Sequence, residues 1–196
     1  MLSSDARVAL RPDATFRELI AERPPGFWRA LARPALVLLV IAVGLPIAAV
    51  HQVTVKLVLT TAAAWSFIVV VQMAIAAAMI ASAPSRRVSF LHAFDLWFAG
   101  HVPYSLWILA IPLVTAVPAG TPHELMGLAF IVPLVWTTVI VAAFCRVVLG
   151  LAAADASRRA ALHLATVVIV VAALATWAAG GPAAIVSYVA HRLGRI

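Results

Sequence analysis

The residues best suited to metal or proton chemistry are His92 and Asp95, which stand three apart, with His101 soon after them. Residues three apart share one face of a helix, and imidazole and carboxylate groups hold transition metals or relay protons. The alternative is that these groups form the wet edge of a helix that lies at a membrane surface. Histidine pairs in metal sites usually show tighter spacing, so the sequence favours the wet edge and predicts no metal.

Three histidines beside or within apolar runs, His51, His101 and His163, are candidates to ligate a cofactor such as haem or chlorophyll. An ionisable residue inside a membrane segment is a functional candidate by default. His163, however, lies only about one turn inside its apolar run, where its ring can still reach the lipid headgroups. We therefore expect no cofactor, and keep a histidine-ligated, cofactor-carrying subunit as an alternative.

Polar side chains within the apolar runs are few, and Gln72, Thr137 and Thr138 are the main ones. A polar group in lipid usually forms a hydrogen bond with a neighbouring helix. We expect Gln72 to find such a partner in Thr137, Thr138 or Ser66. A second alternative is a small transporter or channel-like protein, in which Gln72, Thr137 and Thr138 line a mid-membrane cavity together with Trp65.

Sets of residues that signal an enzyme are missing from the sequence. It contains no glycine-rich phosphate loop, no paired carboxylates and no Ser-His-Asp set with a plausible common site. The single cysteine, Cys145, lies inside an apolar run and excludes an internal disulfide. The sequence therefore predicts a protein that is not an enzyme.

Long stretches without charge must position all of these residues. Hydrophobic residues make up 65% of the 196-residue chain and charged residues 11%, against about 25% charged in soluble domains. Residues 34–83 carry only Lys56, residues 103–145 carry only Glu124, and residues 160–191 carry no charge. A bilayer core of about 30 Å takes roughly 20 residues of helix, so these stretches indicate a membrane protein.

The spacing of the charge gaps predicts an all-α membrane protein with five transmembrane helices, an N-terminal amphipathic helix and one interfacial helix. Residues 1–33 form a cytoplasmic amphipathic segment, residues 34–182 the five-span domain, and residues 183–196 a short C-terminal segment. The expected spans are 34–50, 57–82, 104–117, 125–149 and 160–179, with the interfacial helix at 88–99.

Basic and aromatic residues flank these spans and predict how the chain sits in the membrane. Cytoplasmic loops carry an excess of Lys and Arg, and all such residues except Lys56, Arg192 and Arg195 fall on the N-terminal side of the predicted layout. The N-terminus is therefore expected in the cytoplasm, in a bacterial inner membrane. The residues expected to anchor the protein at the lipid interface are Phe16, Trp28, Arg29, Arg33, Arg86, Arg87, Trp97, Arg158 and Arg159.

Three stretches resemble bacterial members of the Yip1 domain family. They are Pro12–Leu19 with Pro24-Pro25 after it, Ser85–Phe90 followed by His101-Val102-Pro103-Tyr104, and a paired-arginine turn before the last span. The resemblance implies a five-span fold more than an activity. Eukaryotic members bind small GTPases, but this chain lacks their Asp-Leu-Tyr/Trp-Gly-Pro motif, so that partner is not implied here.

The leading hypothesis is a scaffold or accessory subunit that binds other membrane proteins or lipids without catalysis. The abundance of small residues favours close helix packing. The net charge of +7 fits anionic headgroups, and we expect no nucleic-acid partner.

Overall fold

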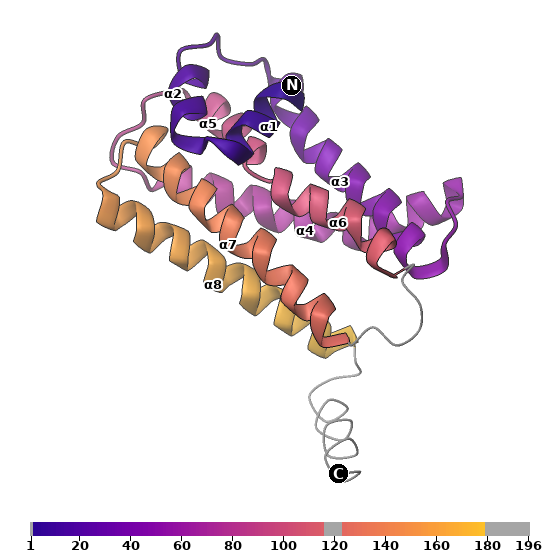
Figure 1. The fold of residues 1–196 in the computed structure, drawn as a ribbon. Helices are drawn as coiled ribbons and strands as arrows, with labels where there is room; N and C mark the ends of the chain where they lie inside the picture. Colours follow the sequence, from indigo (N-terminus) through magenta and orange to yellow (C-terminus); the bar gives the residue numbers. More distant parts are fainter. Residues whose placement is uncertain (1, 116–122, 179–196) are drawn as a thin grey trace, which may run out of the picture. The chain divides into compact units, whose positions relative to one another are not determined.

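A computed structural model of the chain describes residues 2–115 and 123–178, and every regular element in these residues is a helix. Figure 1 shows their arrangement. Met1–Ala160 and Ala161–Ile196 form two compact units, and α8 begins in the first and continues in the second. The helices are α1 (Leu2–Leu10), α2 (Pro12–Leu19), α3 (Phe27–Val50), α4 (Val55–Ala81), α5 (Phe90–Ala99), α6 (Val102–Thr115), α7 (His123–Val147) and α8 (Ala153–Ala178).

Two helices of the described residues, α3 and α4, are long and apolar enough to cross a membrane. They contain 24 and 27 residues, above the roughly 20 that a bilayer core requires. The prediction of five such helices is therefore met in part. The apolar stretch of α7, Ile131–Val147, is shorter, and α6 contains 14 residues. The end of the third predicted span, residue 179 and the segment 183–196 lie outside the described residues.

The helix α3 packs against both α4 and α6, and a glycine permits the second contact. A Cβ atom on Gly44 would lie 2.7 Å from Ile108 Cγ2, closer than real side chains approach. A small residue at such a crossing lets two helix backbones come together. The turn between α3 and α4 is short, as expected, and the Thr54 hydroxyl caps α4 by accepting a hydrogen bond from the Leu57 N–H at 3.2 Å.

At the other end of α3, three short helices gather, and we call α1, α2 and α5 the polar cap (Figure 1). Phe16 of α2 is fully buried and meets the Phe144 ring of α7 edge-on, with ring centroids 5.9 Å apart. Trp136 of α7 donates its indole N–H to the Ala9 carbonyl at 2.8 Å. The N-terminal segment therefore folds onto the helix bundle through its apolar face.

The helix α5 corrects the prediction of an interfacial helix with a wet edge. Its N-terminus is capped by Ser89, whose hydroxyl accepts a hydrogen bond from the His92 N–H at 3.3 Å. Every residue from His92 to Ala99 is buried. The helices α1, α3, α4 and α7 pack against α5. Its polar residues therefore face protein where a wet surface was expected.

Candidate functional site

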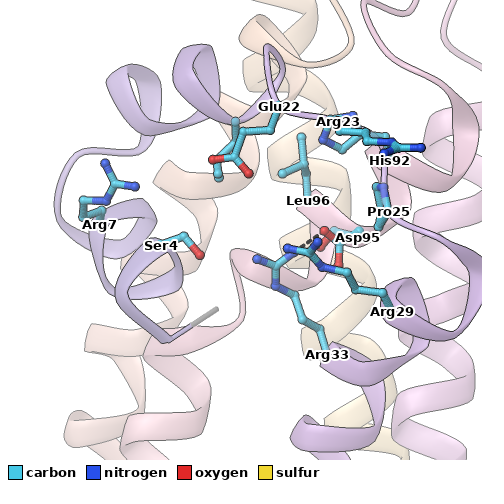
Figure 2. Close-up of a pocket in the computed structure, with 11 residues that line it drawn as sticks. Ser4, Arg7, Glu22, Arg23, Pro25, Arg29, Arg33, His92, Asp95 and Leu96 are labelled. Atoms are coloured by element: carbon cyan, nitrogen blue, oxygen red, sulfur yellow. Dashed lines mark hydrogen bonds and ion pairs between the residues drawn. The ribbon is translucent and has the colours of Figure 1, made fainter.

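A buried ion cluster formed by Asp5, Arg33 and Asp95 lies at the centre of the polar cap. The Arg33 guanidinium donates from Nε and Nη2 to Asp5 Oδ1 at 3.1 and 2.7 Å. Its Nη1 donates to the Asp95 carboxylate and, at 3.2 Å, to the Asp95 main-chain carbonyl. One guanidinium thus joins α1, α3 and α5. Figure 2 shows Arg33 and Asp95 with the dashed line between them.

All three members of this cluster are at most 8% exposed. A buried charge is tolerated only when it is paired and hydrogen-bonded, and the fork of a guanidinium can satisfy two carboxylates at once. The cluster holds two carboxylates for one cation. Burial raises the pKa of Asp95, and the adjacent Arg33 opposes that rise.

His92 lies one turn before Asp95 on α5 and is also buried. Burial lowers the pKa of His92, with Asp95 acting in the opposite direction, so its ring is neutral at neutral pH. Among the described residues, no group of three His, Cys, Asp or Glu side chains is arranged to hold a metal ion. Asp95 is instead engaged by Arg33, and His101 has other partners.

A pocket of about 200 Å³ opens beside the ion cluster (Figure 2). Its wall is rich in arginine, and most of its side chains are polar. Burial differs within it, since Arg33 and His92 are buried while Arg23 and Arg29 are exposed. The residues that line it are Ser4 and Arg7 of α1, Leu19 of α2, Glu22, Arg23 and Pro25 of the following segment, Arg29 and Arg33 of α3, and His92, Asp95 and Leu96 of α5.

His101 and Gln72 form a second buried polar contact. The His101 Nε2 atom lies 3.3 Å from Gln72 Oε1, and its Nδ1 lies 3.1 Å from the Trp97 carbonyl. Gln72 was expected to bond to Thr137, Thr138 or Ser66, and His101 is not among these predicted partners. Because both ring nitrogens of His101 have partners, neither is turned toward a metal or a cofactor.

The other residues of the predicted transport cavity, Thr137, Thr138 and Trp65, have different local environments. The Thr138 hydroxyl donates to the Leu134 carbonyl of its own helix at 2.8 Å. Thr137 is buried, and its hydroxyl has no hydrogen-bond partner among the described residues. Trp65 of α4 is 39% exposed, and its ring is stacked with that of Phe67, with ring centroids 6.1 Å apart.

The other two cofactor candidates have unlike surroundings. His51 is exposed at the end of α3, where it adopts the left-handed conformation with φ of 53°. His163 of α8 is buried and belongs to the second unit of the chain.

The predicted lipid anchors divide into three groups by burial. Phe16, Arg33 and Trp97 are buried inside the protein, which corrects their assignment to the lipid interface. Arg159 is half-buried and bonds to the Met79 carbonyl and the Ser82 hydroxyl at 3.0 and 2.9 Å. The anchors with exposed side chains are Trp28, Arg29, Arg86, Arg87 and Arg158.

The carboxylate partners of the buried Arg33 and the half-buried Arg146 were not predicted from the sequence. Asp5 lies 28 positions from Arg33 in the sequence. Asp13 accepts a hydrogen bond from Arg146 Nη2 at 2.9 Å and lies 133 positions from Arg146. Residues so far apart in the sequence produce no local sequence pattern. The signal that was present is the cation Arg33 at the border of an apolar run, which needs either water or a carboxylate.

No family model, no curated protein and no solved structure matches this chain.

Proposed function

We propose that this chain is a multi-pass membrane scaffold or accessory subunit, which binds membrane-protein partners or lipids without catalysis. The observation that carries the proposal is the outward apolar surface of α3 and α4. Leu39 of α3 is 53% exposed, and Leu59 and Val70 of α4 are 64% and 61% exposed. Water disfavours such a surface, whereas a bilayer covers it.

The low burial of α4 supports a membrane helix over the core helix of a water-soluble protein. Only 17% of the most apolar 18-residue stretch of α4 is buried, and 33% of the corresponding stretch of α3 is buried. A core helix of similar composition would be mostly enclosed by protein. The exposed residues of α3 and α4 therefore support contact with lipid or with an apolar partner.

The full layout in this proposal has five crossings, made by α3, α4, α6, α7 and α8, in a bacterial inner membrane. Basic turns gather at one end, which supports a cytoplasmic N-terminus. The Arg87 N–H donates to the Val148 carbonyl at 3.2 Å, and Arg159 contacts Ser82. The polar cap lies near the same turns, because α5 follows the turn that contains Arg87 and packs against α7. The resemblance to bacterial Yip1 domain proteins is consistent with this layout.

The pairing of the polar residues supports a scaffold over a catalyst. Arg33 bonds to Asp5 and Asp95, Arg146 to Asp13, and His101 to Gln72. These contacts fasten helices to one another. Groups that act on a substrate converge instead on one point in a cleft.

Membrane topology is tested by labelling single introduced cysteines. The native Cys145 should not react with the label, because it is fully buried. Gln52→Cys in the α3–α4 turn and Ser85→Cys in the α4–α5 turn both occupy exposed positions. In intact cells, an impermeant maleimide is expected to label Gln52→Cys, and to label Ser85→Cys only after the membrane is opened. Labelling of both from the same side, or release of the protein by alkaline washing, would contradict the proposal.

Binding of partners is tested by purification of the tagged full-length chain in mild detergent. We expect defined membrane proteins or phospholipids to remain bound in fixed ratio. A protein that always purifies as a lipid-free monomer would rule out the scaffold function while leaving the membrane topology intact.

A further inference from the structure

We propose that the arginine-lined pocket of the polar cap binds the headgroup of an anionic phospholipid, with the phosphate held by Arg23 and Arg29. This inference rests on the proposed membrane function. It adds a specific site and a ligand class to it.

The charge of the pocket wall is the first support. Four arginines line it against two carboxylates. Arg33 is already bound to Asp5 and Asp95, and Arg7 pairs with Glu18 at 2.7 Å. Arg23 and Arg29 have no carboxylate within ion-pair distance in the part of the chain that the structure describes, and both are exposed. Guanidinium groups bind phosphate oxygens in pairs of parallel hydrogen bonds.

The ion cluster gives Arg29 a fixed position. Arg29 and Arg33 stand one turn apart on α3, so their side chains share a face. Arg33 is held from two sides by Asp5 and Asp95. The helix that carries Arg29 is thereby anchored on α1 and α5, and the pocket exists before a ligand arrives.

The second support is size and composition. A pocket of about 200 Å³ is below the roughly 300–1,000 Å³ of sites for drug-sized ligands, so it suits a headgroup. Glu22 is the other carboxylate of the wall and has no ion-pair partner among the described residues. A carboxylate accepts hydrogen bonds from hydroxyl groups. A phosphate next to a glycerol therefore matches both the arginines and Glu22.

The third support favours a lipid over free phosphate. Phe27 and Trp28 begin α3 directly beside the pocket-lining Pro25 and Arg29, and are 57% and 81% exposed. Their rings pack edge-on at 5.3 Å. Aromatic side chains of this kind settle at the boundary between headgroups and acyl chains. Free phosphate has no acyl chain for them to contact.

The test uses the purified full-length protein in detergent, titrated with short-chain phosphatidylglycerol, short-chain phosphatidylcholine or inorganic phosphate. The readouts are Trp fluorescence and melting temperature. We expect phosphatidylglycerol to bind at least tenfold more tightly than the other two. The double variant Arg23→Gln/Arg29→Gln should lose at least tenfold in that affinity, since both guanidinium groups are gone.

The matched control is Arg11→Gln/Arg17→Gln, which removes the same charge from two exposed positions outside the pocket. It should bind phosphatidylglycerol like the original chain. Equal weakening of both double variants would show a general charge effect and overturn the proposal. Equal binding of inorganic phosphate would assign the pocket to free phosphate instead, and equal binding of phosphatidylcholine would remove the selectivity for anionic lipid.

Folding and membrane insertion are checked separately. Circular dichroism and retention in alkali-washed membranes should be unchanged in Arg23→Gln/Arg29→Gln, because both side chains are exposed. A further variant, Phe27→Ser/Trp28→Ser, is expected to weaken the lipid and leave any binding of inorganic phosphate unaltered. A chain that stays in the membrane but shows no preference for phosphatidylglycerol contradicts this inference alone, whereas a chain released from the membrane contradicts the proposed function.

Discussion

The polar cap and the α3–α4 pair place charged and apolar residues in opposite ways. The cap encloses Asp5, Arg33 and Asp95 and turns Phe16 inward. The α3–α4 pair has Leu59 and Val70 on its outside. The cap therefore encloses charged side chains within protein, whereas the α3–α4 pair exposes apolar side chains.

This difference also separates two sources of stability. In the cap, folding must compensate the desolvation of three charges, so the geometry of the ion cluster decides the outcome. In the α3–α4 pair, outward leucines and valines gain nothing from protein packing. Their free energy depends on the medium around them. Substitutions in the two regions should therefore respond to different measurements.

The largest effect is expected for Arg33→Met, a residue of α3 whose guanidinium lies in the ion cluster that the cap encloses. It leaves two buried carboxylates without a cation, and breaking a buried pair on one side costs about 3–5 kcal/mol. We expect a loss near the upper end of that range, measured by denaturant unfolding in detergent. Arg29→Met is the control on the same helix, and an equal loss there would contradict a special role of the cluster.

Phe16→Ala should have the next largest effect, because it removes the ring that packs between α2 and α7. Removal of a buried phenylalanine side chain costs about 3–5 kcal/mol, and we expect a value near 4 kcal/mol in the same unfolding assay. Phe27→Ala is the matched control, since Phe27 is 57% exposed. A smaller loss for Phe16→Ala than for Phe27→Ala would show that α2 does not stabilise the bundle.

Val70→Arg tests the exposed apolar surface of the α3–α4 pair. Val70 is 61% exposed on α4, and an arginine near the centre of a membrane helix costs about 2.5–3.5 kcal/mol on insertion. We expect a reduced membrane-inserted fraction in an insertion assay. Val53→Arg, in the exposed turn before α4, should insert normally. Full insertion of Val70→Arg would remove the contrast between the two regions.

The smallest effect concerns His101 and acid. Burial lowers the pKa of His101 to about 4 from an ordinary value of 6.5. The buried ring must stay neutral, so its contribution to stability is complete above pH 6.5 and declines as the pH falls toward 4. We expect about 2 kcal/mol to be lost by pH 5. The melting temperature should fall with acid, and His101→Gln should reduce this dependence.

The sequence predicts the α3–α4 pair better than it predicts the cap. Length and the absence of charge are enough to predict a long apolar helix, so 34–50 and 57–82 correspond closely to α3 and α4. The first predicted span begins directly after the border residue Arg33, but α3 begins earlier, at Phe27. The reason is that Asp5 and Asp95 neutralise Arg33, so a helix can continue through it.

The cap was predicted less well because its contacts are distant along the chain. His92 and Asp95 were identified as notable residues from their spacing, yet their burial depends on α1 and α3. Periodicity describes one helix and its two faces. It contains no information about a carboxylate such as Asp5 that arrives from another helix, so the pocket could not be anticipated.

The hydrogen bond from Trp136 to Ala9 joins residues 127 positions apart, and this separation has a consequence for synthesis. A ribosome releases α1 well before α7, which lies more than 100 residues further along the chain. The surface on which α1 and α2 rest does not exist until then, since contacts this far apart close late. The helices α1 and α2 are therefore made before α7 but reach their final positions only after it. In the interval they are accessible to chaperones and to the membrane-insertion machinery.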